Sequence, residues 1–168
     1  MRKVRRIILT GVFCVVLCWP AAAETPAAQN AAAQDALIKS QVETAVSMLA
    51  AIHARQQKGE FGPEKARALG AGLLRELRYG KDGYFWADTT GGINVVLYGR
   101  KDTEGRNRLN DRDDKGVFYV KEFLAKGKTG GYVEYHFTKK GQAAPVPKRS
   151  YVLLFEPFGW VVGTGYYR

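Results

Sequence analysis

The hydrophobic residues of the chain follow two periods, and the first of them is helical. Apolar side chains recur at alternating spacings of four and three residues, at Ile38, Val42, Ala45, Leu49 and Ile52. This spacing places them on one face of an α-helix, so it predicts a long amphipathic helix over about 34–58, closed by Gly59. The alternative is a weak homodimer in which this helix pairs as a coiled coil, but the stripe spans under three heptads, which favours packing on a sheet.

A second helix is expected to begin at Pro63, because proline is favoured at the first position of a helix. It should end near residues 79–80, and its expected apolar face is formed by Ala66, Leu69, Leu73 and Leu77. The alanine-rich stretch over 24–33, before the first helix, has no apolar stripe. We expect that stretch to be flexible.

Beyond the second helix the period changes to that of short β-strands. Five runs rich in β-branched and aromatic residues predict strands over 84–88, 93–98, 132–137, 150–156 and 160–166. Gly91 and Gly92 separate the first two runs, and Pro157 and Gly159 separate the last two, which predicts hairpins. With a third helix expected over 117–126, the order of elements indicates an α+β domain around one antiparallel sheet of five or six strands.

The second predicted strand is apolar on both of its faces. Val95 and Leu97 point to one side of the strand and Val96 points to the other. An antiparallel sheet with one face in water alternates more cleanly than this. One face is therefore expected to pack on the helices, while the loop-rich segment over 99–116, with its short helix, covers the other face and leaves a cavity. The charged side chains of that segment are expected to be solvated.

The amino terminus has the pattern of a secretory signal peptide. Basic residues come first, followed by an apolar run over 7–18 and small residues at 21–23 that offer a cleavage site before Glu24. The run is about a dozen residues long, too short to cross a ~30 Å hydrocarbon core as a helix, and an uncleaved anchor is the alternative. The sequence thus predicts a signal peptide over 1–23 and export to the periplasm.

Cleavage after residue 23 changes the composition of the chain. Both cysteines lie in the removed segment, so the mature chain is expected to hold no disulfide. Its formal charge falls from +10, with 26 basic and 16 acidic residues, to +6, with 22 basic and 16 acidic. A basic surface suits nucleic acid, but that partner is scarce outside the cytoplasm, so anionic small molecules or a membrane surface are favoured. The length of the segment 34–168 fits a single domain.

Four strings of residues together resemble the single Cache domain family, in its type-2 branch. The strings are 77–86 (LRYGKDGYFW), 130–135 (GGYVEY), 148–152 (KRSYV) and 155–165 (FEPFGWVVGTG). They occur in the order of that family and place the resemblance over about 74–167. It implies a PAS-like sensor domain outside the cytoplasm that binds a short carboxylate such as acetate, propionate, pyruvate or lactate. Such domains usually belong to a chemoreceptor or a histidine kinase.

Two features depart from the pattern of that family. Where relatives commonly carry a histidine followed by proline, this chain has Tyr98 followed by Gly99. A phenol carries no charge near neutral pH, so we expect a changed ligand preference. The chain also ends at Arg168, directly after the last predicted strand, where receptor relatives enter a transmembrane helix. We therefore expect a standalone module that acts through a membrane receptor, kinase or transporter.

Strand parity selects the candidate ligand-binding aromatics. Tyr84 and Trp86 share one face of the first strand, Tyr135 and Phe137 share one face of the third, and Tyr98 lies across the hairpin from the first. Aromatic walls with a few polar tips suit a small-ligand site, because they exclude water while hydroxyls orient the ligand. The alternative is that these rings are ordinary core, above all Phe137.

Lys148 is the candidate cation for a ligand carboxylate. It opens the family string 148–152 and a strand lined by apolar residues, and a lysine ammonium offers a point charge with three donors. The alternative is a solvated lysine at a strand edge. Arg149 has the opposite parity and is expected to face solvent.

Enzyme chemistry finds little support in this sequence. The two histidines, His53 and His136, have no spacing that joins them as metal ligands, and the motifs HxxxH, CxxC and GxSxG are absent. Ser150 has no convincing base beside it, so we expect no catalytic residue, metal or cofactor. Three functions remain, in falling order: a ligand-binding sensor module, a periplasmic adaptor subunit without a ligand, and a small periplasmic enzyme.

Overall fold

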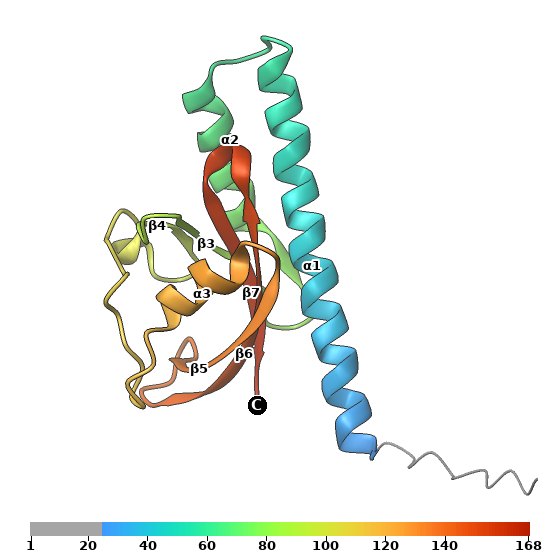
Figure 1. Ribbon diagram of the computed structural model, residues 1–168, viewed down its shortest axis with the longest axis vertical. Coiled ribbons are helices and arrows are strands. Elements are labelled where there is room, and N and C mark those ends of the chain that lie inside the picture. The colour runs from blue at the N-terminus through green and yellow to red at the C-terminus, as the bar shows by residue number, and fades with distance from the viewer. Residues whose placement is uncertain (1–24) are drawn as a thin grey trace, which may run out of the picture.

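The computed structural model describes residues 25–168, in which three α-helices and a five-stranded antiparallel sheet form an α+β domain (Figure 1). This confirms the fold class expected from the sequence. The predicted signal peptide over 1–23 lies outside the described residues. Within them, no helix combines the length and the apolar character that crossing a bilayer requires.

The first helix, α1 (Pro26–Gln57), begins earlier than the hydrophobic stripe predicts. Thr25 caps it, because its hydroxyl accepts a hydrogen bond from the backbone N–H of Ala28 at 3.3 Å, and Pro26 occupies the first turn. Alanine has the highest helix propensity of all residues, so the stretch needs no apolar stripe to be helical. The expectation of a flexible segment over 24–33 is corrected: the chain is helical from Pro26 on.

All five residues of the predicted stripe on α1 are buried against the sheet and α2, which confirms packing on a sheet. The coiled-coil alternative is wrong for this stripe, because the chain itself covers it. His53, on the same helix, packs edge-on against Phe155 and Phe158 with ring centroids 6.3 and 6.0 Å away. Figure 1 shows α1 running the full length of the domain.

The second helix, α2 (Pro63–Glu76), begins at the predicted proline but buries a different face. Its buried residues are Ala66, Gly70 and Leu74, whereas Leu69 and Leu73 of the predicted face are 38 and 45% exposed. Gly70 explains why this face of α2 is turned towards α1, because a Cβ atom there would lie only 2.8 Å from a methyl carbon of Leu49 on α1. The close approach of α1 and α2 at this glycine, and not the spacing of the leucines, decides which face of α2 is buried.

The strands match the five predicted runs, with shifted ends. The first run divides into two, and a small hairpin precedes the main sheet, so the strands are β1 (Arg78–Tyr79), β2 (Gly83–Tyr84), β3 (Trp86–Thr89), β4 (Asn94–Leu97), β5 (Gly131–Thr138), β6 (Pro145–Phe155) and β7 (Trp160–Tyr167). The order in the main sheet is β4-β3-β7-β6-β5, with every pair antiparallel. Both predicted hairpins are present, and Gly159 adopts the left-handed conformation (φ 65°) at the turn between β6 and β7.

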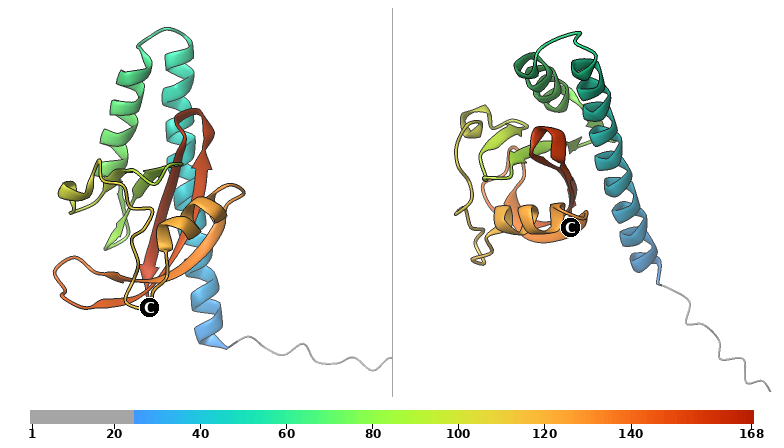
Figure 2. Two further views of the ribbon diagram at one scale, coloured as in Figure 1. Left: turned by 60° about the vertical axis from the view of Figure 1, so that its left-hand side comes forward. Right: turned by 45° about the horizontal axis from the view of Figure 1, so that its top comes forward.

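Both faces of the sheet are covered, as its two apolar faces predict. Helices α1 and α2 lie on one face, and α3 (Tyr119–Gly127) lies on the other (Figure 2). Val96 packs in the core beneath α1 and α2, while its neighbour Leu97 packs in the core beneath α3. The second core holds most of the candidate site.

Candidate functional site

Lys148 lies in the interior of the sheet, on β6, and its side chain is 2% exposed. Its ammonium nitrogen lies 4.4 Å from the ring centroid of Tyr84 and 4.9 Å from that of Trp86. The rings of Phe137 and Tyr167 are 5.3 and 4.8 Å away. The lysine also donates a hydrogen bond of 2.6 Å to the Tyr84 hydroxyl. The alternative of a solvated strand-edge lysine is therefore wrong.

No carboxylate forms an ion pair with Lys148 among residues 25–168. Burial, together with the positive charges of Arg108 and Arg100, lowers its pKa to about 7. A buried charge without a counter-ion is costly, because the interior replaces the hydration of the ammonium only in part. An anion that enters beside Lys148 would remove this cost.

Tyr135 and Trp86 border the same small inner chamber as Lys148. The Tyr135 hydroxyl lies 3.2 Å from that of Ser150, and burial raises its pKa. The indole N–H of Trp86 is buried without a hydrogen-bond partner in the described part of the chain, so it is an unused donor. Gly163 makes room for this indole, since a Cβ atom there would lie 2.5 Å from its ring.

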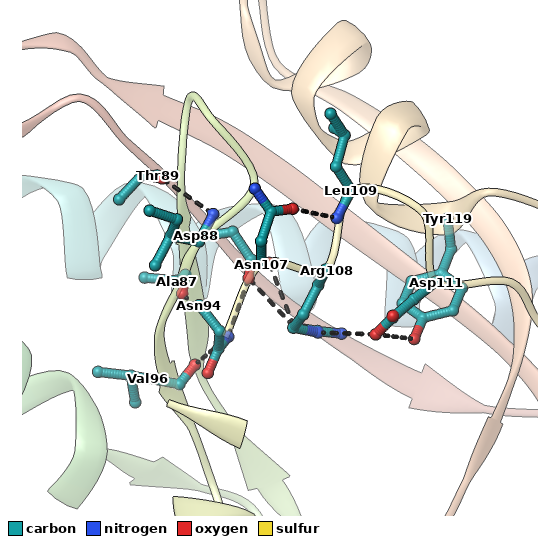
Figure 3. Close-up of polar contacts among 11 residues, drawn as sticks. Ala87, Asp88, Thr89, Asn94, Val96, Asn107, Arg108, Leu109, Asp111 and Tyr119 are labelled. Carbon is teal, nitrogen blue, oxygen red and sulfur yellow. Dashed lines mark hydrogen bonds and ion pairs between the residues drawn. The ribbon is translucent and has the colours of Figure 1, made fainter. Parts of the chain in front are cut away.

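Arg108 is a buried residue of this region that the sequence reasoning missed. It belongs to the segment expected to be solvated, yet its side chain is 3% exposed and lies 3.1 Å from the carboxylate of Asp88, itself 1% exposed (Figure 3). Asn94 donates to the same carboxylate at 2.9 Å, and Asp111 lies 3.5 Å from Arg108 on the other side. The expectation of solvation is corrected for Arg108, which ties the covering loop to β3 and borders the inner chamber.

A larger outer chamber of about 570 Å³ adjoins the inner one and shares Tyr84 and Phe137 with its lining. Tyr84 and Phe137 line both chambers, Trp86, Tyr135 and Lys148 line the inner one, and Tyr98 lines the outer one. The structure thus gathers the six residues predicted from the sequence around two adjoining spaces. The inner chamber is only about 10 Å³ and is nearly filled by its own side chains.

Tyr98, the residue in place of the family histidine, lies at the wall of the outer chamber. The guanidinium carbon of Arg78 lies 3.6 Å from the centroid of its ring, and Lys140 donates to its hydroxyl at 3.4 Å. These two cations lower the pKa of Tyr98, the lysine more than the arginine. Its ring centroid is 5.6 Å from that of Tyr84. Tyr84 and Phe137, which line both chambers, form the aromatic partition between them.

Arg149, next to Lys148 on β6, points to the opposite face of the sheet. It forms a bidentate ion pair of 2.8 Å with Asp35 on α1, and Tyr166 donates to the same carboxylate at 3.1 Å. The expectation that Arg149 faces solvent is wrong, because α1 covers it. β6 therefore presents Lys148, which has no carboxylate partner among the described residues, to the chambers and the paired Arg149 to α1.

The two histidines take no part in either chamber. His136 lies 2.7 Å from the carboxylate of Asp114, outside the lining of both spaces. No group of three acidic, histidine or cysteine side chains that could hold a metal ion occurs within residues 25–168.

The chain matches the family model of the Single Cache domain 2 over residues 31–168. It is 33% identical over 128 residues to the methyl-accepting chemotaxis protein McpP of Pseudomonas putida, covering 75% of this chain and 24% of that protein. It is 34% identical over 120 residues to the sensor histidine kinase MctS of Rhizobium johnstonii, covering 71% of this chain and 26% of that protein. The chain thus spans about a quarter of the length of these curated relatives.

Two solved structures share the fold over most of the domain. One is a periplasmic sensor domain of a chemotaxis protein, with a TM-score of 0.76 and 32% identity over 86% of this chain and 99% of that one. The other was described for carboxylic acid recognition by a Cache chemosensory domain, with a TM-score of 0.78 and 29% identity over the same shares.

Proposed function

The chain belongs to the single Cache domain 2 family, and from this premise we propose that it is a periplasmic sensor module that binds a short carboxylate and acts through a separate membrane partner. The partner would be a receptor, a kinase or a transporter, in keeping with the chemoreceptor and the histidine kinase among its relatives. The signal-peptide pattern and the likeness to a periplasmic sensor domain support the location. We expect binding without turnover.

The observation that carries the proposal is the buried Lys148 ammonium without a counter-ion. Arg108, the other buried cation at the inner chamber, is already neutralised by Asp88 at 3.1 Å. Lys148 is therefore the charge available to a ligand carboxylate, and the unpaired indole N–H of Trp86 is a second donor beside it. The neighbouring structure described for carboxylic acid recognition supports an acid as the ligand.

Access to Lys148 requires a side-chain movement. The inner chamber has room for about one water molecule, too little for even a two-carbon acid. Tyr84 and Phe137 line both chambers, so a rotation of either ring would join the two spaces. A carboxylate that arrives through the outer chamber would then meet Lys148 in place of the Tyr84 hydroxyl.

Isothermal titration calorimetry with acetate, propionate, pyruvate and lactate tests the proposal. Lys148→Met should weaken binding about 30-fold or more, because it removes one partner of a buried charge pair. Lys65→Met is the matched control, since Lys65 is exposed on α2, on the opposite face of the sheet, and should bind as the wild type does. Unchanged affinity in Lys148→Met would refute the site. The absence of binding by any acid would favour an adaptor without a ligand, and conversion of an acid would indicate an enzyme.

A further inference from the structure

The outer chamber is lined by an excess of positive charge. Its lining contains one acidic residue, Asp82, and five basic residues, Arg78, Lys81, Arg100, Lys139 and Lys140. Only Lys139 of these five forms an ion pair within residues 25–168, with Asp82 at 3.0 Å. The remaining four cations converge on one hollow and have no carboxylate partner in the described chain. A monocarboxylate held by Lys148 would leave all of them without an anion.

The inner and outer cations are arranged around the same aromatic partition. The guanidinium carbon of Arg100 lies 5.0 Å from the Phe137 ring centroid, and the Lys148 ammonium lies 5.3 Å from that same centroid. The two positive charges therefore cannot be farther apart than the sum of these two distances. Arg78 and Lys140 extend the outer cationic region around Tyr98.

The size of the outer chamber also exceeds what a two- to four-carbon acid needs. At about 570 Å³ it lies within the range of about 300–1,000 Å³ that drug-sized ligands occupy. An acid with one carboxylate at Lys148 and a short carbon chain past the partition would bring its far end to Arg100 and Lys140. Guanidinium and ammonium groups are the donors that proteins use to bind a carboxylate.

We propose that the site prefers a linear dicarboxylate, whose inner carboxylate meets Lys148 and whose outer carboxylate meets Arg100 and Lys140. This inference rests on the proposed function, because it uses the same inner position. It assigns the outer cations a role in specificity, in which they distinguish acids by the charge at the far end of the carbon chain.

Matched pairs of acids test the inference by isothermal titration calorimetry. Butyrate and succinate, pentanoate and glutarate, and hexanoate and adipate differ within each pair only by a terminal methyl group or carboxylate. At least one dicarboxylate should bind about tenfold or more tightly than its partner, which corresponds to about 1.4 kcal/mol. Arg100→Gln and Lys140→Gln should each lower the affinity for that dicarboxylate more than the affinity for its partner, and raised salt should do the same. Lys121→Gln, on the exposed surface of α3, is the control.

The outcomes separate this inference from the proposed function. Binding of monocarboxylates with equal or weaker binding of every dicarboxylate would overturn the inference and leave the proposed function in place. Binding of neither class would overturn both. A dicarboxylate preference that survives Arg100→Gln and Lys140→Gln together would overturn the role of the outer cations. A preference that disappears in the double variant, while the protein keeps its wild-type thermal unfolding, supports it.

Discussion

Replacing the buried lysine should stabilise the empty protein while it removes ligand binding. Burial lowers the pKa of Lys148 to about 7, whereas an unfolded lysine titrates near 10.4. Below pH 7 both states carry the charge, and the folded state bears the full cost of burying it. Between pH 7 and about 10.4 the unfolded chain binds the extra proton, so the stability of the wild type rises with pH over this window.

The size of the effect follows from the shift in pKa. A difference of about three pKa units at 1.36 kcal/mol each gives a cost of about 4 kcal/mol at pH 6. Methionine has a similar length and no charge. It cannot make the 2.6 Å hydrogen bond from Lys148 to Tyr84, and this loss reduces the expected stabilisation by about 1 kcal/mol. Tyr84 keeps a partner, because its hydroxyl lies 3.2 Å from that of Tyr167. We expect Lys148→Met to raise the free energy of unfolding by about 3 kcal/mol at pH 6 and by about 1 kcal/mol at pH 9.

Urea unfolding without ligand at pH 6 and pH 9 measures this change. Lys65→Met again serves as the control, and its difference from the wild type should not depend on pH. A Lys148→Met protein that is less stable than the wild type, or whose gain is the same at both pH values, would refute the reasoning. Either result would mean that the ammonium is already satisfied in the empty protein.

Three further predictions concern the titration and packing of the same strands. Affinity for propionate should fall by up to about tenfold per pH unit above pH 7, because binding then requires Lys148 to regain a proton. Calorimetry at pH 6.5, 7.5 and 8.5 measures this dependence, and an affinity that does not change with pH would contradict it. Asp35→Asn should cost about 1–2 kcal/mol in urea at pH 7, since it weakens the ion pair with Arg149. That pair lowers the pKa of Asp35, so the loss should disappear as the pH falls through the folded-state pKa, and a loss that persists in acid would argue against the pair. Gly163→Ala should cost about 2 kcal/mol, because its Cβ atom meets the Trp86 ring; unchanged stability would show that the indole can move.

The sequence predicts the elements of this fold well where local periodicity decides. The stripe from Ile38 to Ile52 is buried at every position, because a single helix packs on a continuous sheet. The face of α2 could not be predicted, since it depends on how closely Gly70 lets Leu49 approach. Helical propensity likewise extends α1 to Pro26, beyond its hydrophobic stripe.

The sequence selects residues that the folded chain brings together around the two chambers, but it does not reveal their electrostatics. Strand parity and the family strings select Lys148 and the aromatic side chains around it. The ion pairs depend on contacts between distant segments, so no local pattern reveals them. Arg108 reaches Asp88, which lies 20 residues earlier in the chain, and Arg149 reaches Asp35 on α1, which lies 114 residues earlier. Only the folded chain shows that these cations are paired and that Lys148 has no carboxylate partner within residues 25–168.

A titration of the Lys148 ammonium tests the central claim most directly. Heteronuclear NMR of lysine-labelled protein should show one lysine that titrates near pH 7 and is missing from Lys148→Met. A saturating acid, propionate or succinate, should raise the pKa of that lysine by at least about one unit, because a bound carboxylate favours the charged ammonium. If no lysine titrates below about pH 9, or if its pKa does not change when the acid binds, Lys148 is not the carboxylate-binding group.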